Sequence, residues 1–241
     1  MLFMQLARST LVDPKKTAPT RREAGKKSHL QRAAEMGAFD AALVTGGGSG
    51  VGRALAILLA GSGTRVTIVG RRAEALDETR RLASKRGIDG ITAVAADVST
   101  MAGREEIATS FATEQFRMDK SAEKMCLVHN AAVTGDLATI DGLDPENFRA
   151  AMATNVEGPL FLTQQILPRM AEGSRVLHLS SGSAHRGTAG MVPYCASKAR
   201  AEPTQLAMLR SPSATPPRYS PTSLMHGRRR SSPCARACEM S

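Results

Sequence analysis

Short apolar runs alternate with longer amphipathic segments along the chain from about Phe39 onward. The runs are apolar without polar alternation, which predicts strands buried on both faces at residues 41–45, 65–69, 91–95, 125–129 and 175–179. The longer segments predict helices near residues 51–62, 73–86, 102–117 and 146–171. Strands and helices that alternate in this way are joined by right-handed crossovers. The pattern therefore predicts an α/β fold with a doubly wound parallel sheet, the Rossmann fold.

The same pattern sets the expected domain limits. Residues 38–202 are long enough for one α/β domain with a substantial core. Residues 1–37 are basic and show little apolar periodicity, and residues 203–241 are rich in Pro, Ser and Arg, so both predict disordered tails. A mitochondrial presequence remains an alternative for the first tail, although its acidic residues count against it.

The basic charge of the chain lies in its two ends. The formal net charge is +10, and residues 36–198 are neutral overall. A domain built to hold nucleic acid is expected to carry a basic face and stacking aromatics, and only 3% of the residues are aromatic. Binding of RNA or anionic lipid by the tails remains an alternative. No apolar run reaches the roughly 18 residues that span a bilayer, so we expect a soluble, cytoplasmic protein.

The four cysteines are Cys126, Cys195, Cys234 and Cys238. Cys126 lies in an apolar run and Cys195 follows a tyrosine, so neither is placed for an obvious disulfide. This usage favours a reducing compartment. No CxxC or HxxxH pair accompanies the last two cysteines, and we expect no metal site.

A glycine-rich stretch, TGGGSGVG at residues 45–52, joins the first predicted strand to the first predicted helix. Glycines permit a sharp turn and a close backbone approach to a phosphate, and the helix directs its free N–H groups at the anion. The stretch predicts a site for the pyrophosphate of a dinucleotide; its alternative is a flexible loop. The expected binding residues are Gly46, Ser49, Gly50, Val51 and Gly52.

The end of the second predicted strand indicates which dinucleotide is bound. An acidic residue here would bind the ribose of NAD, but none occurs between Ser62 and Ala73. Arg71 can instead form charge-assisted hydrogen bonds to a 2′-phosphate, which predicts NADP. The alternative is that Arg71 and Arg72 are solvated residues at the start of a helix.

The third and fourth predicted strands also end in candidate cofactor residues. The carboxylate of Asp97, which precedes Val98, can accept a hydrogen bond from the adenine amino group, or it can cap the following turn. Asn130 and Ala131 follow the fourth strand and would let a nucleotide lie against its end. We expect His129 to pack beside the strand and assign it no chemistry.

The candidate catalytic residues lie around the fifth predicted strand. Ser181 follows this strand, and Tyr194 and Lys198 are spaced i and i+4 on one helix face. The Lys198 ammonium would favour the Tyr194 phenolate, and Lys198 would also hold the nicotinamide ribose. Tyr194 would then donate a proton to a carbonyl oxygen that Ser181 orients, as hydride reaches the carbon. Asn155, inside an apolar helix, is either a structural bridge or part of a polar relay.

Together these motifs resemble the short-chain dehydrogenase/reductase family over about residues 39–200. TGGGSGVG is similar to the family's TGxxxGxG, Asn130-Ala131-Ala132 resembles NAG, and Ser181 with Tyr194 and Lys198 fits the serine and YxxxK. The resemblance implies an NADP(H)-dependent carbonyl reductase or alcohol dehydrogenase with Asn155 in a water-mediated proton relay. The stretch from Ser180 to Ala199 also resembles sepiapterin-reductase-like and benzil-reductase-like members.

The chain departs from this family after Lys198. The family continues this helix, which commonly forms a homodimer interface, and then adds two strands, a loop over the nicotinamide and a substrate-binding segment. Here Pro203 interrupts the expected helix and no strand-like run follows, so we expect the last strands of the family sheet to be lacking. We hypothesise a frameshift, altered splice or faulty gene model near residue 200. A truncated, catalytically inactive NADP-binding or interaction protein is therefore the alternative function.

Overall fold

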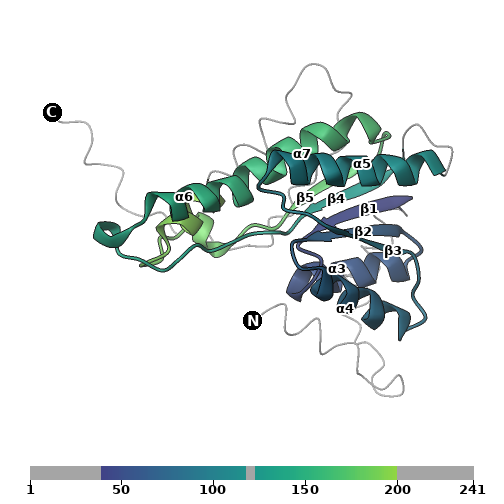
Figure 1. Cartoon of the computed structure of the whole chain (residues 1–241), viewed down its shortest axis with the longest axis horizontal. Helices are drawn as coiled ribbons and strands as arrows, with labels where there is room; N and C mark the ends of the chain where they lie inside the picture. The colour runs from purple at the N-terminus through teal and green to yellow at the C-terminus, as the bar shows by residue number, and fades with distance from the viewer. Residues whose placement is uncertain (1–38, 118–122, 200–241) are drawn as a thin grey trace, which may run out of the picture. The chain divides into compact units, whose positions relative to one another are not determined.

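A single parallel sheet organises the computed structural model, which describes residues 39–117 and 123–199 (Figure 1). Its strands follow the order β3-β2-β1-β4-β5, and every neighbouring pair is parallel. The strands are β1 (Ala41–Thr45), β2 (Arg65–Gly70), β3 (Ile91–Ala95), β4 (Met125–His129) and β5 (Arg175–His178). The chain winds from β1 toward β3 and then returns to the other side of β1, so the predicted doubly wound α/β fold is confirmed. The strand order reverses between β1 and β4, where such sheets bind their ligands.

Helices cover both faces of the sheet. The helices packed on it are α3 (Gly50–Gly61), α4 (Ala73–Ser84), α5 (Met101–Arg117) and α7 (Gly158–Ile166). Figure 1 shows α3 and α4 on one face and α5 and α7 on the other. The first three agree with the predicted helices to within one or two residues at each end.

The central strand β1 is buried along its whole length. Its alternate side chains enter two separate apolar clusters, because successive residues of a strand point to opposite faces. Leu43 packs in the cluster that contains Ile107 of α5 and Ile166 of α7. Val44 packs in the other cluster, beside α3 and α4. An apolar run without polar alternation is thus what a strand between two helical layers requires.

The segment predicted as helical at residues 146–171 is helical from residue 145 to residue 169, but it is not one regular α-helix. The segment is divided into α6 (Pro145–Met152), a π-helical turn (Ala153–Glu157), α7 and a 3₁₀ turn (Leu167–Arg169). Pro159 supplies the physical reason, because it has no N–H to donate to the carbonyl of Asn155 four residues earlier. Apolar periodicity does not report this loss, so the sequence pattern continued through the interruption.

Polar contacts join the segments at the amino ends of the strands. The fully buried carboxylate of Glu123 pairs with Arg65 of β2. The backbone N–H of Lys124 donates to the carboxylate of Asp40 at 3.0 Å. These contacts join the starts of β2 and β4. They lie at the end of the sheet opposite the glycine turn.

Several sequence predictions fall outside the described residues: the tails at 1–37 and 203–241, the interruption at Pro203, and Cys234 with Cys238. Cys126 and Cys195 are free thiols. Within the described part of the chain, no helix is long and apolar enough to cross a membrane, and no cluster of potential metal ligands occurs.

Candidate active site

A cavity of about 370 Å³ opens at the carboxyl ends of the strands. Nine of the predicted cofactor-binding residues line it, from the ends of β1, β2, β3 and β4: Gly46, Ser49, Gly50, Val51, Arg71, Asp97, Val98, Asn130 and Ala131. Gly52, Tyr194 and Lys198 are not in its lining. The cavity therefore joins four of the five sequence stretches that were singled out separately.

The glycine turn has no space for side chains at its critical positions. A Cβ atom on Gly52 would lie 2.3 Å from the carbonyl oxygen of Gly46 and 2.4 Å from Nδ2 of Asn130. Gly46 and Gly50 have positive φ angles of 67° and 54°, which glycine adopts without strain. The turn thus requires glycine for both backbone conformation and close packing.

Asn130 fastens the glycine turn to the end of β4. Its Nδ2 donates hydrogen bonds to the carbonyl oxygens of Thr45 at 3.0 Å and Gly46 at 3.1 Å. The Thr45 hydroxyl in turn accepts the backbone N–H groups of Asn130 and Ala131, both at 3.1 Å. These bonds fix the floor of the cavity between β1 and β4.

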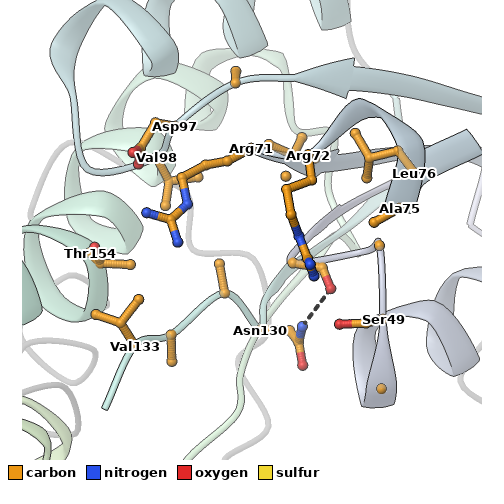
Figure 2. Close-up of a pocket in the computed structure, with 18 of the residues that line it drawn as sticks. Ser49, Arg71, Arg72, Ala75, Leu76, Asp97, Val98, Asn130, Val133 and Thr154 are labelled. Carbon is orange, nitrogen blue, oxygen red and sulfur yellow. Dashed lines mark hydrogen bonds between the residues drawn. The ribbon is translucent and has the colours of Figure 1, made fainter. Parts of the chain in front are cut away.

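The wall formed by β2 and β3 carries charged side chains. Figure 2 shows Arg71 and Arg72 extending into the cavity. Asp97 lies in the same wall, and its Oδ1 accepts hydrogen bonds from the backbone N–H of Ser99 at 2.9 Å and its hydroxyl at 2.7 Å. Asp97 therefore does cap the following turn, and its carboxylate also reaches the cavity. Arg72 was not among the predicted binding residues.

Asn155 is buried in the π-helical turn and joins two other segments. Its Oδ1 accepts the N–H of Val133 at 2.8 Å, and its Nδ2 donates to the Val133 carbonyl and to the Ser197 hydroxyl, each at 2.8 Å. Ser197 is also buried and donates to the carbonyl of Tyr194 at 2.8 Å. Of the two roles expected for this side chain, the structural bridge is present.

The helical residues 192–199 hold Tyr194 and Lys198 together. The Lys198 ammonium lies 5.7 Å from the centroid of the Tyr194 ring and donates to the Leu179 carbonyl at 2.8 Å. Burial lowers the pKa of Lys198 below its usual range. Ser181 lies earlier in the chain, directly before a 3₁₀ turn (Gly182–Ala184). Its hydroxyl accepts the N–H of Ser183 at 3.2 Å. Among the described residues, no hydrogen bond joins Ser181 to Tyr194.

Two histidines lie behind this helix, at the ends of β4 and β5. His129 and His178 are in register and their ring centroids are 4.4 Å apart. His129 also contacts the Thr163 hydroxyl at 2.8 Å. Burial, followed by the charge of Lys198, lowers the pKa of His178 to about 3, and burial lowers the pKa of His129 well below its usual range. His129 packs beside the strand as expected.

Some residues that shape the site carry no strong signal in the sequence. Thr45 and Ser197 act through hydroxyl groups that contact distant segments, and Val133 acts through its backbone. The position of Thr45 at the end of a predicted strand is the one signal that could have identified it. Ser197 is separated from Asn155 by 42 positions, so only the fold reveals their contact.

Comparisons with known proteins agree on one family. The family model described as short chain dehydrogenase matches residues 40–208. An uncharacterized oxidoreductase of Myxococcus xanthus is 36% identical over 169 residues, which cover 69% of this chain and 63% of the relative. NADPH-dependent aldehyde reductase 1, chloroplastic, of Arabidopsis thaliana is 29% identical over 167 residues, covering 65% and 54%.

A solved structure supports the same conclusion about the fold. The metagenomic short-chain oxidoreductase in complex with NADP is 25% identical, with a TM-score of 0.62, over 70% of this chain and 75% of that one. The chain spans 53% to 63% of the length of the first curated relatives that it matches.

Proposed function

The chain belongs to the short-chain dehydrogenase family, and we propose that it is an oxidoreductase that transfers a hydride between NADP(H) and a carbonyl or alcohol substrate. One observation carries this proposal. The glycine turn and Arg71 line the same cavity, and the end of β2 presents arginines where an NAD-binding site would place a carboxylate. Members of this family use NAD or NADP, and the arginines favour NADP.

The residues of the cavity fit such a cofactor. A Cβ on Gly46 or Gly52 would strike Asn130 Nδ2, so these glycines let the turn pack against the end of β4. The packed turn places Gly46, Gly48, Ser49, Gly50 and Val51 in the lining of the cavity, where their main chain is available to a pyrophosphate. We assign the pyrophosphate to the turn and the first amides of α3, the 2′-phosphate to Arg71, and the adenine amino group to Asp97. The NADP-bound metagenomic relative and the NADPH-dependent Arabidopsis relative support this choice.

A bound nicotinamide would supply or accept the hydride, and the protein would handle the proton. In the reductive direction, Tyr194 donates its phenolic proton to the substrate oxygen, and Ser181 donates a hydrogen bond that orients this oxygen. The Lys198 ammonium stabilises the resulting phenolate. It has three N–H donors, of which one is used on Leu179, so the others can serve Tyr194 and the nicotinamide ribose.

Asn155 would support this proton transfer in two ways. Its bridge to Ser197 fixes the helix that carries the tyrosine and lysine. Both amide protons are used in that bridge and on Val133, whereas Oδ1 can accept one more hydrogen bond. A water molecule that donates a hydrogen bond to Asn155 Oδ1 could therefore take part in the proton relay without breaking the bridge.

The test is NADPH oxidation with a panel of aldehydes, ketones and diketones, using the wild-type chain and Tyr194→Phe. The variant keeps the ring and loses the proton donor, so we expect turnover to disappear while NADPH binding persists. Activity that survives the substitution would refute the assigned role. NADPH binding without turnover of any substrate by the wild-type chain would favour the inactive nucleotide-binding alternative. The sepiapterin-reductase-like or benzil-reductase-like subtype stays a prediction, which the diketones address.

A further inference from the structure

Two side chains outside the cavity hold the carbonyl groups of the glycine turn. The hydroxyl of Thr79, on α4, donates to the carbonyl oxygen of Gly47 at 2.9 Å. The guanidinium of Arg53, in the first turn of α3, donates to the carbonyl oxygen of Gly48. Arg53 Nε also donates to the Thr79 hydroxyl at 3.0 Å. Thr79 and Arg53 therefore form one connected unit that binds two successive carbonyl groups.

The turn is packed closely against the elements that carry this unit. A Cβ on Gly47 would lie 2.6 Å from Cβ of Ile68 in β2, and one on Gly48 would lie 3.0 Å from Cβ of Ala75 in α4. Thr79 is fully buried, so water does not replace its hydroxyl. The carbonyl groups of the turn are thus fixed by both packing and hydrogen bonds.

The geometry of a peptide bond converts this support into an effect on the cavity. In a trans peptide the C=O of one residue and the N–H of the next point in opposite directions, and the described chain has no cis peptide. Neither Thr79 nor Arg53 lines the cavity, whereas Gly48 and Ser49 do. Carbonyl groups of Gly47 and Gly48 held away from the cavity leave the N–H groups of Gly48 and Ser49 directed toward it.

We propose that Thr79 and Arg53 are positioning residues for the phosphate site, which orient the N–H groups of Gly48 and Ser49 toward the 5′-phosphate of the cofactor. This inference rests on the proposed function, because it concerns the same cofactor site. Neither residue touches the cofactor itself. Their effect is specific to the phosphate next to the turn, and the adenine and 2′-phosphate at the other wall are independent of it.

The experiment compares the dissociation constants of 2′-AMP and 2′,5′-ADP by titration calorimetry. The two ligands share the adenosine 2′-phosphate and differ in the 5′-phosphate, so the ratio of their constants reports that phosphate alone. Thr79→Val is nearly isosteric but leaves the buried Gly47 carbonyl without its partner. We expect the dissociation constant of 2′,5′-ADP to rise about tenfold relative to that of 2′-AMP, while the dissociation constant of 2′-AMP stays within about twofold of the wild-type value.

Controls separate positioning from general loss of structure. Thr79→Ser keeps the hydroxyl and is expected to retain the wild-type ratio. Thr113→Val on α5 is the same substitution at an exposed helical threonine, whose hydroxyl donates to the Thr109 carbonyl at 2.9 Å, and it should change the binding of neither ligand. Partial unfolding would lower the binding stoichiometry for both ligands and leave their ratio unchanged.

The outcomes distinguish this inference from the proposed function. A wild-type ratio in folded Thr79→Val would overturn the positioning role. If that variant does not fold, Arg53→Met carries the test, because Arg53 is only partly buried and its loss removes the bond to Gly48. A wild-type chain that binds neither ligand, or that binds both equally, would overturn the cofactor site itself.

Discussion

Asn155 and Ser197 are joined by a hydrogen bond of 2.8 Å that connects the π-helical turn to the helix of Tyr194 and Lys198. Both side chains are buried, and the Ser197 hydroxyl passes the connection on to the Tyr194 carbonyl. The Nδ2 of Asn155 donates to the Val133 carbonyl and to the Ser197 hydroxyl, so the π-helical turn and this helix meet through polar groups. The position of the candidate catalytic tyrosine therefore depends on an amide in a different helix.

Removing this bridge should impair turnover more than cofactor binding. Asn155→Leu loses three hydrogen bonds and leaves Val133 and Ser197 without their partner, so we expect a loss of about 2–4 kcal/mol in the free energy of unfolding. Ser197→Ala loses the bonds to Asn155 and to the Tyr194 carbonyl and leaves a buried amide proton of Asn155 unpaired, so it should cost about 1–3 kcal/mol. Urea denaturation measures both, and kcat with NADPH measures the effect on Tyr194.

A double variant provides the control for this prediction. If Asn155 and Ser197 act through their mutual bond, the effects of the two substitutions on unfolding and on kcat are less than additive. Strict additivity would contradict a direct connection. Thr163 offers no such coupling to Ser197, because its hydroxyl contacts His129 and Pro159 instead.

The strand pattern could be predicted from the sequence because burial on two faces leaves a direct record. Residues 41–44 are all apolar and are followed by Thr45, and the observed β1 has the predicted limits, Ala41–Thr45. The helix interruption at Asn155 could not be read in the same way. Its cause is one missing N–H at Pro159, which changes the hydrogen-bond pattern without changing the apolar periodicity.

The candidate site divides along similar lines. Gly46 and Arg71 could be predicted because each follows a strand and its chemistry is distinctive. Thr79 and Ser197 could not, since a threonine or serine in a helix gives no sign of its distant partner. Their hydroxyl groups matter because of contacts between elements, and such contacts exist only once the sheet has formed.

The glycine at position 52 should be intolerant of any side chain. In Gly52→Ala the new methyl group would meet the Gly46 carbonyl at 2.3 Å and Asn130 Nδ2 at 2.4 Å, so the turn must move. We expect NADPH affinity to fall about tenfold or more, since the displaced amides no longer meet the phosphate. Gly142→Ala is the control, because its nearest neighbour would be the Thr139 hydroxyl at 3.8 Å. Equal NADPH affinity in the two variants would contradict the binding of the cofactor phosphate by the glycine turn.

Arg71 should set the preference for NADPH over NADH. Charge-assisted hydrogen bonds to a phosphate contribute about 1.5–3 kcal/mol, so Arg71→Ala is expected to weaken NADPH binding by about ten- to a hundredfold. NADH lacks the 2′-phosphate, so its dissociation constant should change little. Fluorescence titration with both nucleotides measures the ratio. Arg80→Ala on α4 is the matched control, because Arg80 lies outside the cavity; a similar loss there would point to a general charge effect.

The buried histidine pair should make the fold sensitive to acid. In the unfolded chain a histidine has a pKa near 6.5, about the usual value, whereas burial and Lys198 lower the pKa of His178 to about 3 in the folded chain. Between these values the unfolded chain binds more protons, so stability falls as the pH falls. The loss begins near pH 6.5 and reaches about 2 kcal/mol for His178 at pH 5.

Replacing one histidine of the pair tests this dependence. Urea denaturation at several pH values between 7 and 5 should show a shallower loss of stability for His178→Leu than for the wild-type chain, because one of the two protonation steps is removed. Leu177→Ala, in the same strand, is the control for altered packing, and it should lower stability equally at every pH. A variant His178→Leu that loses stability as steeply as the wild-type chain would show that other groups cause the acid sensitivity. Burial also lowers the pKa of His129, so we expect the protonation of His129 to cause the acid sensitivity that remains in His178→Leu.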